Sequence, residues 1–339
     1  MSAIREGDAV AGDLGGYAYT SNVLACRAFA WTIVIATLVF ILNNYLTLWW
    51  DWPGARSVST GNAGALGWLQ LFSYAGCAIA AVFHVHRNKT RSLRADAAAI
   101  YRISAYIIRG AFWMVVIVGL ADMILSFLRV EGLLPDLVGE KMAKDLGRSS
   151  YRGLYVHVPL ICLSFVVAAF TRTLGFTWLA LLVVIAELQI VISRFIFSYE
   201  QAFMGDIVRF WYAGLFLFAS AYTLTEEGHV RVDVLYAGFK GKTKGLVNAF
   251  GSILLGASLC YVVLWLGMGS KSSIINAPIL AYEVTQQGFG MYVKYLMAAF
   301  LAIFAVSMMI QFAGYFLEGI ADYRGDPDKR KLDSEPAPH

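Results

Sequence analysis

Charged side chains are scarce in this sequence. Asp, Glu, Lys and Arg make up only 15% of the 339 residues, whereas 59% are hydrophobic and the mean hydropathy is +0.62. Soluble domains are only roughly 45–50% apolar. The shortage of charge therefore argues against an ordinary soluble protein and favours a chain that lies in a membrane. The net charge of +4 is small and its basic residues lie between apolar runs, so nucleic acid is not an expected partner.

Cysteine and catalytic motifs are equally sparse. The four cysteines lie inside or at the edge of separate apolar runs, where cysteine behaves as a small hydrophobic residue. This placement argues against a disulfide framework or a thiolate metal site. The sequence also has no HExxH, GxSxG or GxxxxGK[ST] motif. We therefore expect neither a metal site nor an enzyme active site.

A cleavable secretory signal is missing as well. The first 22 residues are polar and slightly acidic, without a basic segment followed by a short apolar one. The first long apolar run is therefore expected to be retained as a membrane helix.

Long apolar runs are what the sequence has in abundance. A helix that crosses the hydrocarbon core needs about 20 apolar residues, because each residue adds about 1.5 Å across a core about 30 Å thick. The sequence therefore predicts an all-α integral membrane protein with eight transmembrane helices. Their expected positions are Ala28–Trp49, Gly64–Phe83, Ile103–Leu128, Leu154–Phe170, Thr177–Phe197, Ile207–Leu224, Leu246–Met268 and Tyr292–Leu317.

The basic residues between these runs predict the orientation. Lys and Arg are enriched in cytoplasmic loops. They gather between the second and third runs, between the sixth and seventh, and in the tail, so both termini are expected to be cytoplasmic. The loop from Arg129 to Arg152 then lies outside despite its five basic residues, which four acids accompany. Its apolar residues have roughly helical spacing, so it is either a helix along the membrane surface or an ordinary solvated loop.

Four ionisable residues fall within the apolar runs. Such residues are costly in a bilayer and mark candidate functional positions. Arg109 and Asp122 are about 20 Å apart along the third helix, so each needs a partner elsewhere. Glu187 and Arg194 are seven residues apart and share one face of the fifth helix, which favours contact with another subunit over a solute pathway.

The histidines raise a different class of function. A membrane anchor or electron-transfer subunit that binds haem needs two imidazoles at the same depth. His84 and His86 leave the second helix on the cytoplasmic side, whereas His157 begins the fourth helix on the opposite side. This mismatch disfavours haem, although a haem or quinone subunit stays the alternative hypothesis.

The stretch from Ser193 to Tyr236 carries the most specific pattern. Three motifs follow one another in it: RFIF at residues 194–197, an acid and an arginine at Asp206 and Arg209, and EEGHVRVD at residues 226–233. This pattern resembles the small permease subunit (DctQ-like) of tripartite ATP-independent periplasmic (TRAP) transporters. The resemblance runs from near Leu174 to about Ile320. It departs from the family at Phe203 and Asp206, where Trp and Glu are usual, and in the four preceding helices.

The resemblance implies an organisation and a function. A four-helix DctQ-like unit is expected at residues 173–320, after a membrane extension of four helices at 1–172 and before a polar cytoplasmic tail at 321–339. The chain would be a multi-pass protein of the bacterial inner membrane that packs against a large permease (DctM-like) subunit. A periplasmic substrate-binding protein would deliver a small organic anion, such as a carboxylate, for sodium-coupled uptake. The chain itself needs no cofactor, lipid surrounds it, and the sodium ions are expected in the partner subunit.

The resemblance and the charge pattern together nominate an interface with the large subunit. Residues 229–233 alternate polar side chains with valine, so an extended strip there would have one polar and one apolar side. The nominated residues are Glu187, Arg194, Asp206, Arg209, Glu226, Glu227, His229, Arg231 and Asp233.

Overall fold

The computed structural model describes residues 20–172, 176–225 and 234–327, and within these ranges every regular element is a helix. Eight helical segments are long and apolar enough to cross a membrane. They are α1 (Ser21–Trp49), α2 (Gly64–Arg87), α3 (Leu93–Val130), α7 with its preceding turns (Ser149–Phe170), α8 (Phe176–Phe197), α9 (Ala202–Thr225), α11 to α12 (Gly241–Met268) and α14 (Lys294–Arg324).

Short elements connect these segments. They include a 3-10 turn (Ala55–Val58), α4 (Leu134–Val138), α5 (Glu140–Leu146), α6 (Ser149–Arg152), α10 (Val234–Ala237) and α13 (Asn276–Ala281). Two π-turns interrupt the longer segments, one at Gly153–His157 before α7 (Val158–Phe170) and one at Ser252–Ala257 between α11 (Gly241–Gly251) and α12 (Ser258–Met268).

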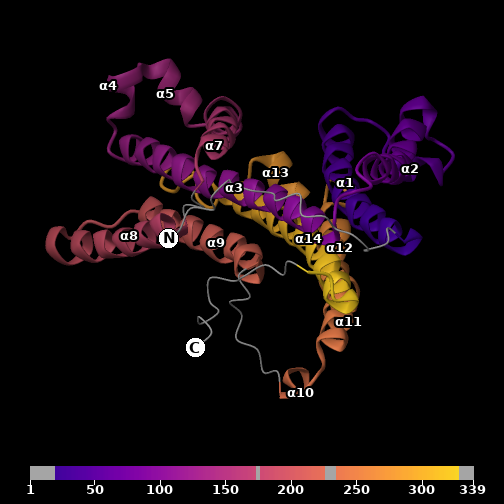
Figure 1. Ribbon diagram of the computed structural model, residues 1–339. Helices are drawn as coiled ribbons and strands as arrows, with labels where there is room; N and C mark the ends of the chain where they lie inside the picture. The colour runs from indigo at the N-terminus through magenta and orange to yellow at the C-terminus, as the bar shows by residue number, and fades with distance from the viewer. Residues whose placement is uncertain (1–19, 173–175, 226–233, 328–339) are drawn as a thin grey trace.

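Helices α3 and α14 form the centre of the molecule and lie side by side along its long direction (Figure 1). They are antiparallel, because Arg94 near the start of α3 forms an ion pair of 2.8 Å with Asp322 near the end of α14. Further along the pair, the hydroxyl of Ser104 donates to the carbonyl of Ser307 at 3.1 Å. The start of α3 is fixed by Ser92, whose hydroxyl accepts from the backbone N–H of Ala95 as an N-cap.

The other spanning helices pack around this central pair. Helix α9 contacts both α3 and α14, α7 packs on α3, and α1 packs on α14. Helix α11 approaches α14 at backbone distance, because a Cβ atom at Gly245 would lie 2.6 Å from the carbonyl oxygen of Gly319. Two helices are more peripheral: α2 packs on α1, and α8, the least buried of the eight spans, packs mainly on α9 (Figure 1).

The eight predicted spans are confirmed, but several helices are longer than their apolar cores. Helix α1 begins seven residues earlier than expected, because Arg27 is fully buried and bonds to Asp96 at 2.7 Å instead of marking the membrane surface. In the loop from Arg129 to Arg152 the structure has the short helices α4 and α5, with Leu137 and Val138 exposed. The loop therefore contains helical turns, one of the two alternatives that the sequence left open, and its position relative to the membrane surface stays a prediction.

Both predicted domains contribute to one hydrophobic core. This core joins residues of α1 and α3 to residues of α9, α12 and α14. Helix α14 also continues past Ile320 to Arg324, and Ala321 is fully buried. The boundary near Arg172 stays a prediction, and the packing shows that the helices before it are integrated with those after it.

Candidate functional site

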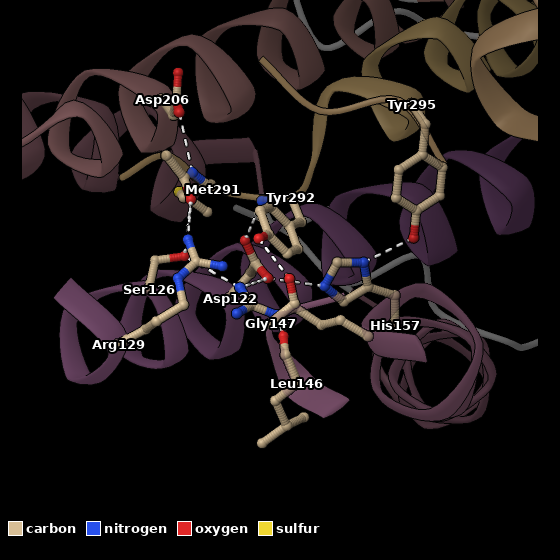
Figure 2. A network of polar contacts seen from close by, with 12 residues as sticks. Asp122, Ser126, Arg129, Leu146, Gly147, His157, Asp206, Met291, Tyr292 and Tyr295 are labelled. Atoms are coloured by element: carbon tan, nitrogen blue, oxygen red, sulfur yellow. Dashed lines mark hydrogen bonds and ion pairs between the residues drawn. The ribbon is translucent and has the colours of Figure 1, made fainter. Parts of the chain in front are cut away.

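The carboxylate of Asp122 is the centre of a buried polar network near the end of α3 (Figure 2). Its Oδ1 accepts a hydrogen bond from Nη1 of Arg152 at 2.9 Å and lies 3.0 Å from Nε2 of His157. Its Oδ2 accepts from the backbone N–H of Tyr292 at 2.7 Å. Asp122, Arg152 and His157 are all fully buried. A buried charge needs such partners, because leaving it unpaired costs several kcal/mol, on the order of 3–5 when a partner is removed.

A π-turn brings the two basic partners to this carboxylate. Arg152 ends α6, and the π-turn runs from Gly153 to His157. A π-turn contains an extra residue relative to an α-helical turn, and such turns are frequent at functional positions. Gly153 is required here, because a Cβ atom would lie 2.3 Å from the ring of Tyr282. The local backbone thus lets two basic side chains reach Asp122.

Both ring nitrogens of His157 are engaged. Nε2 faces Asp122, and Nδ1 lies 2.7 Å from the hydroxyl of Tyr295, whose ring is nearly parallel to the imidazole. His84 lies in the last turn of α2, beside Trp31 and near the start of α3, whereas His157 contacts Asp122 near the end of α3. Among the described residues, no two histidines face one another as a pair of haem ligands would.

The segment that precedes α14 is held by two acids from different parts of the chain. Residues 290–293 are buried and not helical, so their backbone groups need partners other than water. Oδ2 of Asp206 on α9 accepts from the N–H of Met291 at 3.0 Å, and Asp122 accepts from the next N–H, that of Tyr292 (Figure 2). Asp122 belongs to the N-terminal region, residues 1–172, and Asp206 belongs to the region that resembles the small permease subunit, residues 173–320.

Two arginines complete the network around Tyr292. The guanidinium carbon of Arg129 lies 4.4 Å from the centre of its ring and that of Arg152 lies 4.3 Å away, both within the range of a cation–π contact. Arg129 also donates to the carbonyl of Gly290 at 2.8 Å, as does the hydroxyl of Ser126 at 3.3 Å. The network therefore joins α3, the start of α7, α9 and the start of α14 into one rigid end of the bundle.

The tyrosine between α8 and α9 adds a contact at the same end. The hydroxyl of Tyr199 donates to Oε1 of Glu131 at 2.5 Å. Burial and the adjacent Glu131 carboxylate raise the pKa of Tyr199 to about 12. The hydroxyl therefore keeps its proton, and with it this hydrogen bond, well above neutral pH.

The structure places the sequence-nominated residues in different environments. Asp122 and Asp206 are brought together by Met291 and Tyr292, and Asp206 is buried within the chain. Arg209 is 3.7 Å from Asp206 but its side chain is 71% exposed, so it carries charge at the surface. Arg109 is partly buried on α3, away from this network.

The other nominated residues lie on α8 or outside the described ranges. Arg194 forms a 3.4 Å ion pair with Glu200, with both side chains more than half exposed. Glu187 is exposed on α8. The nominated positions Glu226, Glu227, His229, Arg231 and Asp233 lie outside the residues that the structure describes.

The sequence alone does not predict the partners of Asp122. In the sequence Arg152 is one of several loop charges and His157 a possible haem ligand, whereas in the structure both belong to this network. One signal was available: Asp122 lies near the end of the third apolar run, and Arg152 and His157 lie near the start of the next, so all three share one side of the membrane in the predicted topology.

The site and the fold define an all-helical integral membrane protein without a recognisable catalytic constellation among its described residues, where no cluster of three metal-binding side chains occurs either. Residues 180–322 match the family model of the DctQ component of tripartite ATP-independent periplasmic transporters. The resemblance to the small permease subunit is confirmed for this region, and the helices before it are an addition to it. Comparisons with curated proteins and with solved structures gave no match.

Proposed function

We propose that this chain is the scaffold subunit of a TRAP transporter of the bacterial inner membrane, packed against a large permease subunit. A periplasmic binding protein supplies the solute, a small organic anion such as a carboxylate, and its uptake is coupled to sodium. The observation that carries the proposal is the DctQ match over residues 180–322. The chain supports the moving subunit and does not bind the solute itself.

The packing supports a static role. A scaffold must resist deformation while its partner moves, and buried ionic networks with discrete geometry rigidify the elements they join. Here the Asp122 network fixes one end of α3, and the buried Arg27–Asp96 pair fixes the other. The two acids are 26 residues apart on one helix, or roughly 39 Å. Rigid contacts thus bracket a largely apolar stretch that is long enough to cross a membrane.

The exposed charges on α8 and α9, all within the DctQ region, support a partner subunit on that side of the molecule. Glu187, Arg194 and Arg209 all present charge from α8 and α9. Exposed ionisable side chains on membrane helices are rare unless another protein, water or headgroups meet them. We assign these three residues, with Glu226, Glu227, His229, Arg231 and Asp233, to the interface with the large subunit. Asp206 lies beneath that surface, where its carboxylate accepts a hydrogen bond from Met291 and faces the guanidinium of Arg209.

Purification from native membranes tests this proposal. The tagged chain is isolated in mild detergent, and the sample is analysed by mass spectrometry and by absorbance spectroscopy. We expect a stoichiometric, larger polytopic partner and no haem band. A haem band, or a chain recovered alone that transports solute in vesicles, would contradict the proposal.

A further inference from the structure

Helix α8 has one buried face and one face without a partner in the chain. Its buried side chains are Leu179, Val183 and Ala186, which pack towards α9. The opposite sides are exposed and almost entirely apolar, and Figure 1 shows α8 at the edge of the molecule, next to α9. In the middle of the span, a lipid-facing helix would look the same except for the amide of Gln189 and one ionisable residue.

That residue is Glu187, at the middle of the span Thr177–Phe197. Its side chain is exposed and has no hydrogen bond or ion pair with any residue in the described part of the chain. The side chains one turn away on the same side, Val184 and Val191, are 63% and 48% exposed. A carboxylate in the hydrocarbon core is costly, and such groups normally face protein and pair with a partner.

The positions around Glu187 have the spacing of a helix-packing seam. Residues of α8 that are three and four positions apart lie on one side of the helix, and this is the spacing of a helix–helix contact. The members are Thr177, Ala180, Val184, Glu187, Val191 and Arg194. The first three are small or short, which allows close approach of a second helix in a membrane. Glu187 is the polar member at the middle of the seam, flanked by Val184 and Val191, and a polar residue in such a position also fixes the register of two helices.

We propose that this seam receives a helix of the large permease subunit that carries a basic side chain, Arg or Lys, at the depth of Glu187. The inference rests on the proposed function and adds the chemistry of the partner. The partner's cation forms an ion pair with Glu187, which removes the cost of the unpaired carboxylate and sets the depth of one helix against the other. The apolar members of the seam supply the close packing on either side of this pair.

Site-specific photo-crosslinking within the whole complex tests the position of the seam. A photo-reactive residue is placed at Val184, in the seam, or at the matched control Ile185, which is also exposed but points about 100° away around the helix. The large subunit is co-expressed in both cases. We expect crosslinks to the large subunit from position 184 and several-fold fewer from position 185. Equal yields, or crosslinks from position 184 to a second copy of this chain, would overturn the inference.

Substitution of Glu187 tests the chemistry. Glu187→Leu should reduce the retained large subunit by about tenfold after detergent washing, because a charge-assisted hydrogen bond is lost. Glu187→Gln should fall between this variant and the unsubstituted chain, and the control Ile185→Leu should retain the complex. Full retention by Glu187→Leu would overturn the ion pair. If the unsubstituted chain retained no large subunit, the proposed function itself would be overturned. If the large subunit were retained but crosslinked equally from positions 184 and 185, only the position of the seam would be overturned.

Discussion

Replacing Asp122 by Asn removes the charge at the centre of the buried network while preserving the size of the side chain. The guanidinium of Arg152, fully buried and 2.9 Å from Asp122, would then be left without its counter-charge. Removing one partner of a buried ion pair typically costs 3–5 kcal/mol, so we expect the variant to lose about 3 kcal/mol of unfolding free energy. The measurement is unfolding of the purified chain in detergent, followed by loss of the folded species with temperature or denaturant.

Two controls separate the lost charge from other effects of substitution. Asp145→Asn removes an exposed pair with Arg148 and should cost less than about 1 kcal/mol. The double variant Asp122→Asn with Arg152→Met removes both charges and should recover part of the loss, because a buried pair replaced by uncharged groups is often tolerated. If Asp122→Asn cost no more than Asp145→Asn, or if the double variant showed no recovery, the network would not be held by the Asp122–Arg152 pair.

The remaining predictions concern helix packing and one tyrosine. Gly245→Ala should cost about 3 kcal/mol, because its Cβ atom would lie 2.4 Å from the backbone nitrogen of Tyr323, whereas Gly251→Ala, where the space is open, should cost nothing; thermal unfolding of both variants compares them. The raised pKa of Tyr199 stabilises the folded chain below the ordinary tyrosine pKa of about 10, and this contribution is lost as the pH rises through about 12. Ultraviolet titration of Tyr199→Phe should therefore lack one tyrosine that ionises near pH 12, and an unchanged titration would contradict the Glu131 contact.

The spanning helices were predictable because hydrocarbon imposes a simple requirement on length and composition. Helix α8, for example, was predicted as Thr177–Phe197, the span that the structure has, since apolar residues cover most of its exposed surface. The start of α1 was not predicted correctly, because the predicted apolar run begins only after Arg27. The tertiary contact with Asp96 explains why this charged residue is buried inside the helix.

The network was only partly predictable. The sequence marked Asp122 as a residue that needs a partner, but it could not choose among the basic residues of other segments, since that choice depends on how α3 and the π-turn before α7 pack. The buried role of Asp206 was also missed. Its sequence position at the start of a helix predicts surface charge, whereas its carboxylate is used by the non-helical segment before α14. Both misses concern contacts between segments that are far apart in the chain.

The integration of the N-terminal helices has a physical consequence for the proposed scaffold. Asp122 and Asp206 bind adjacent backbone N–H groups, so the added helices share the contacts that position the start of α14. The proposed scaffold is therefore broader than the DctQ region at 180–322, and one hydrophobic core joins the two parts. Greater width adds contact with the bilayer and with a partner, which resists tilting of a static subunit.

Reconstitution of transport tests the central claim most directly. Vesicles are prepared with the large permease subunit and this chain together, with either alone, and the periplasmic binding protein is added with an organic anion and a sodium gradient. We predict uptake only when both membrane subunits are present. Uptake by this chain alone, or undiminished uptake by the large subunit without it, would contradict the account of this protein as a transporter scaffold.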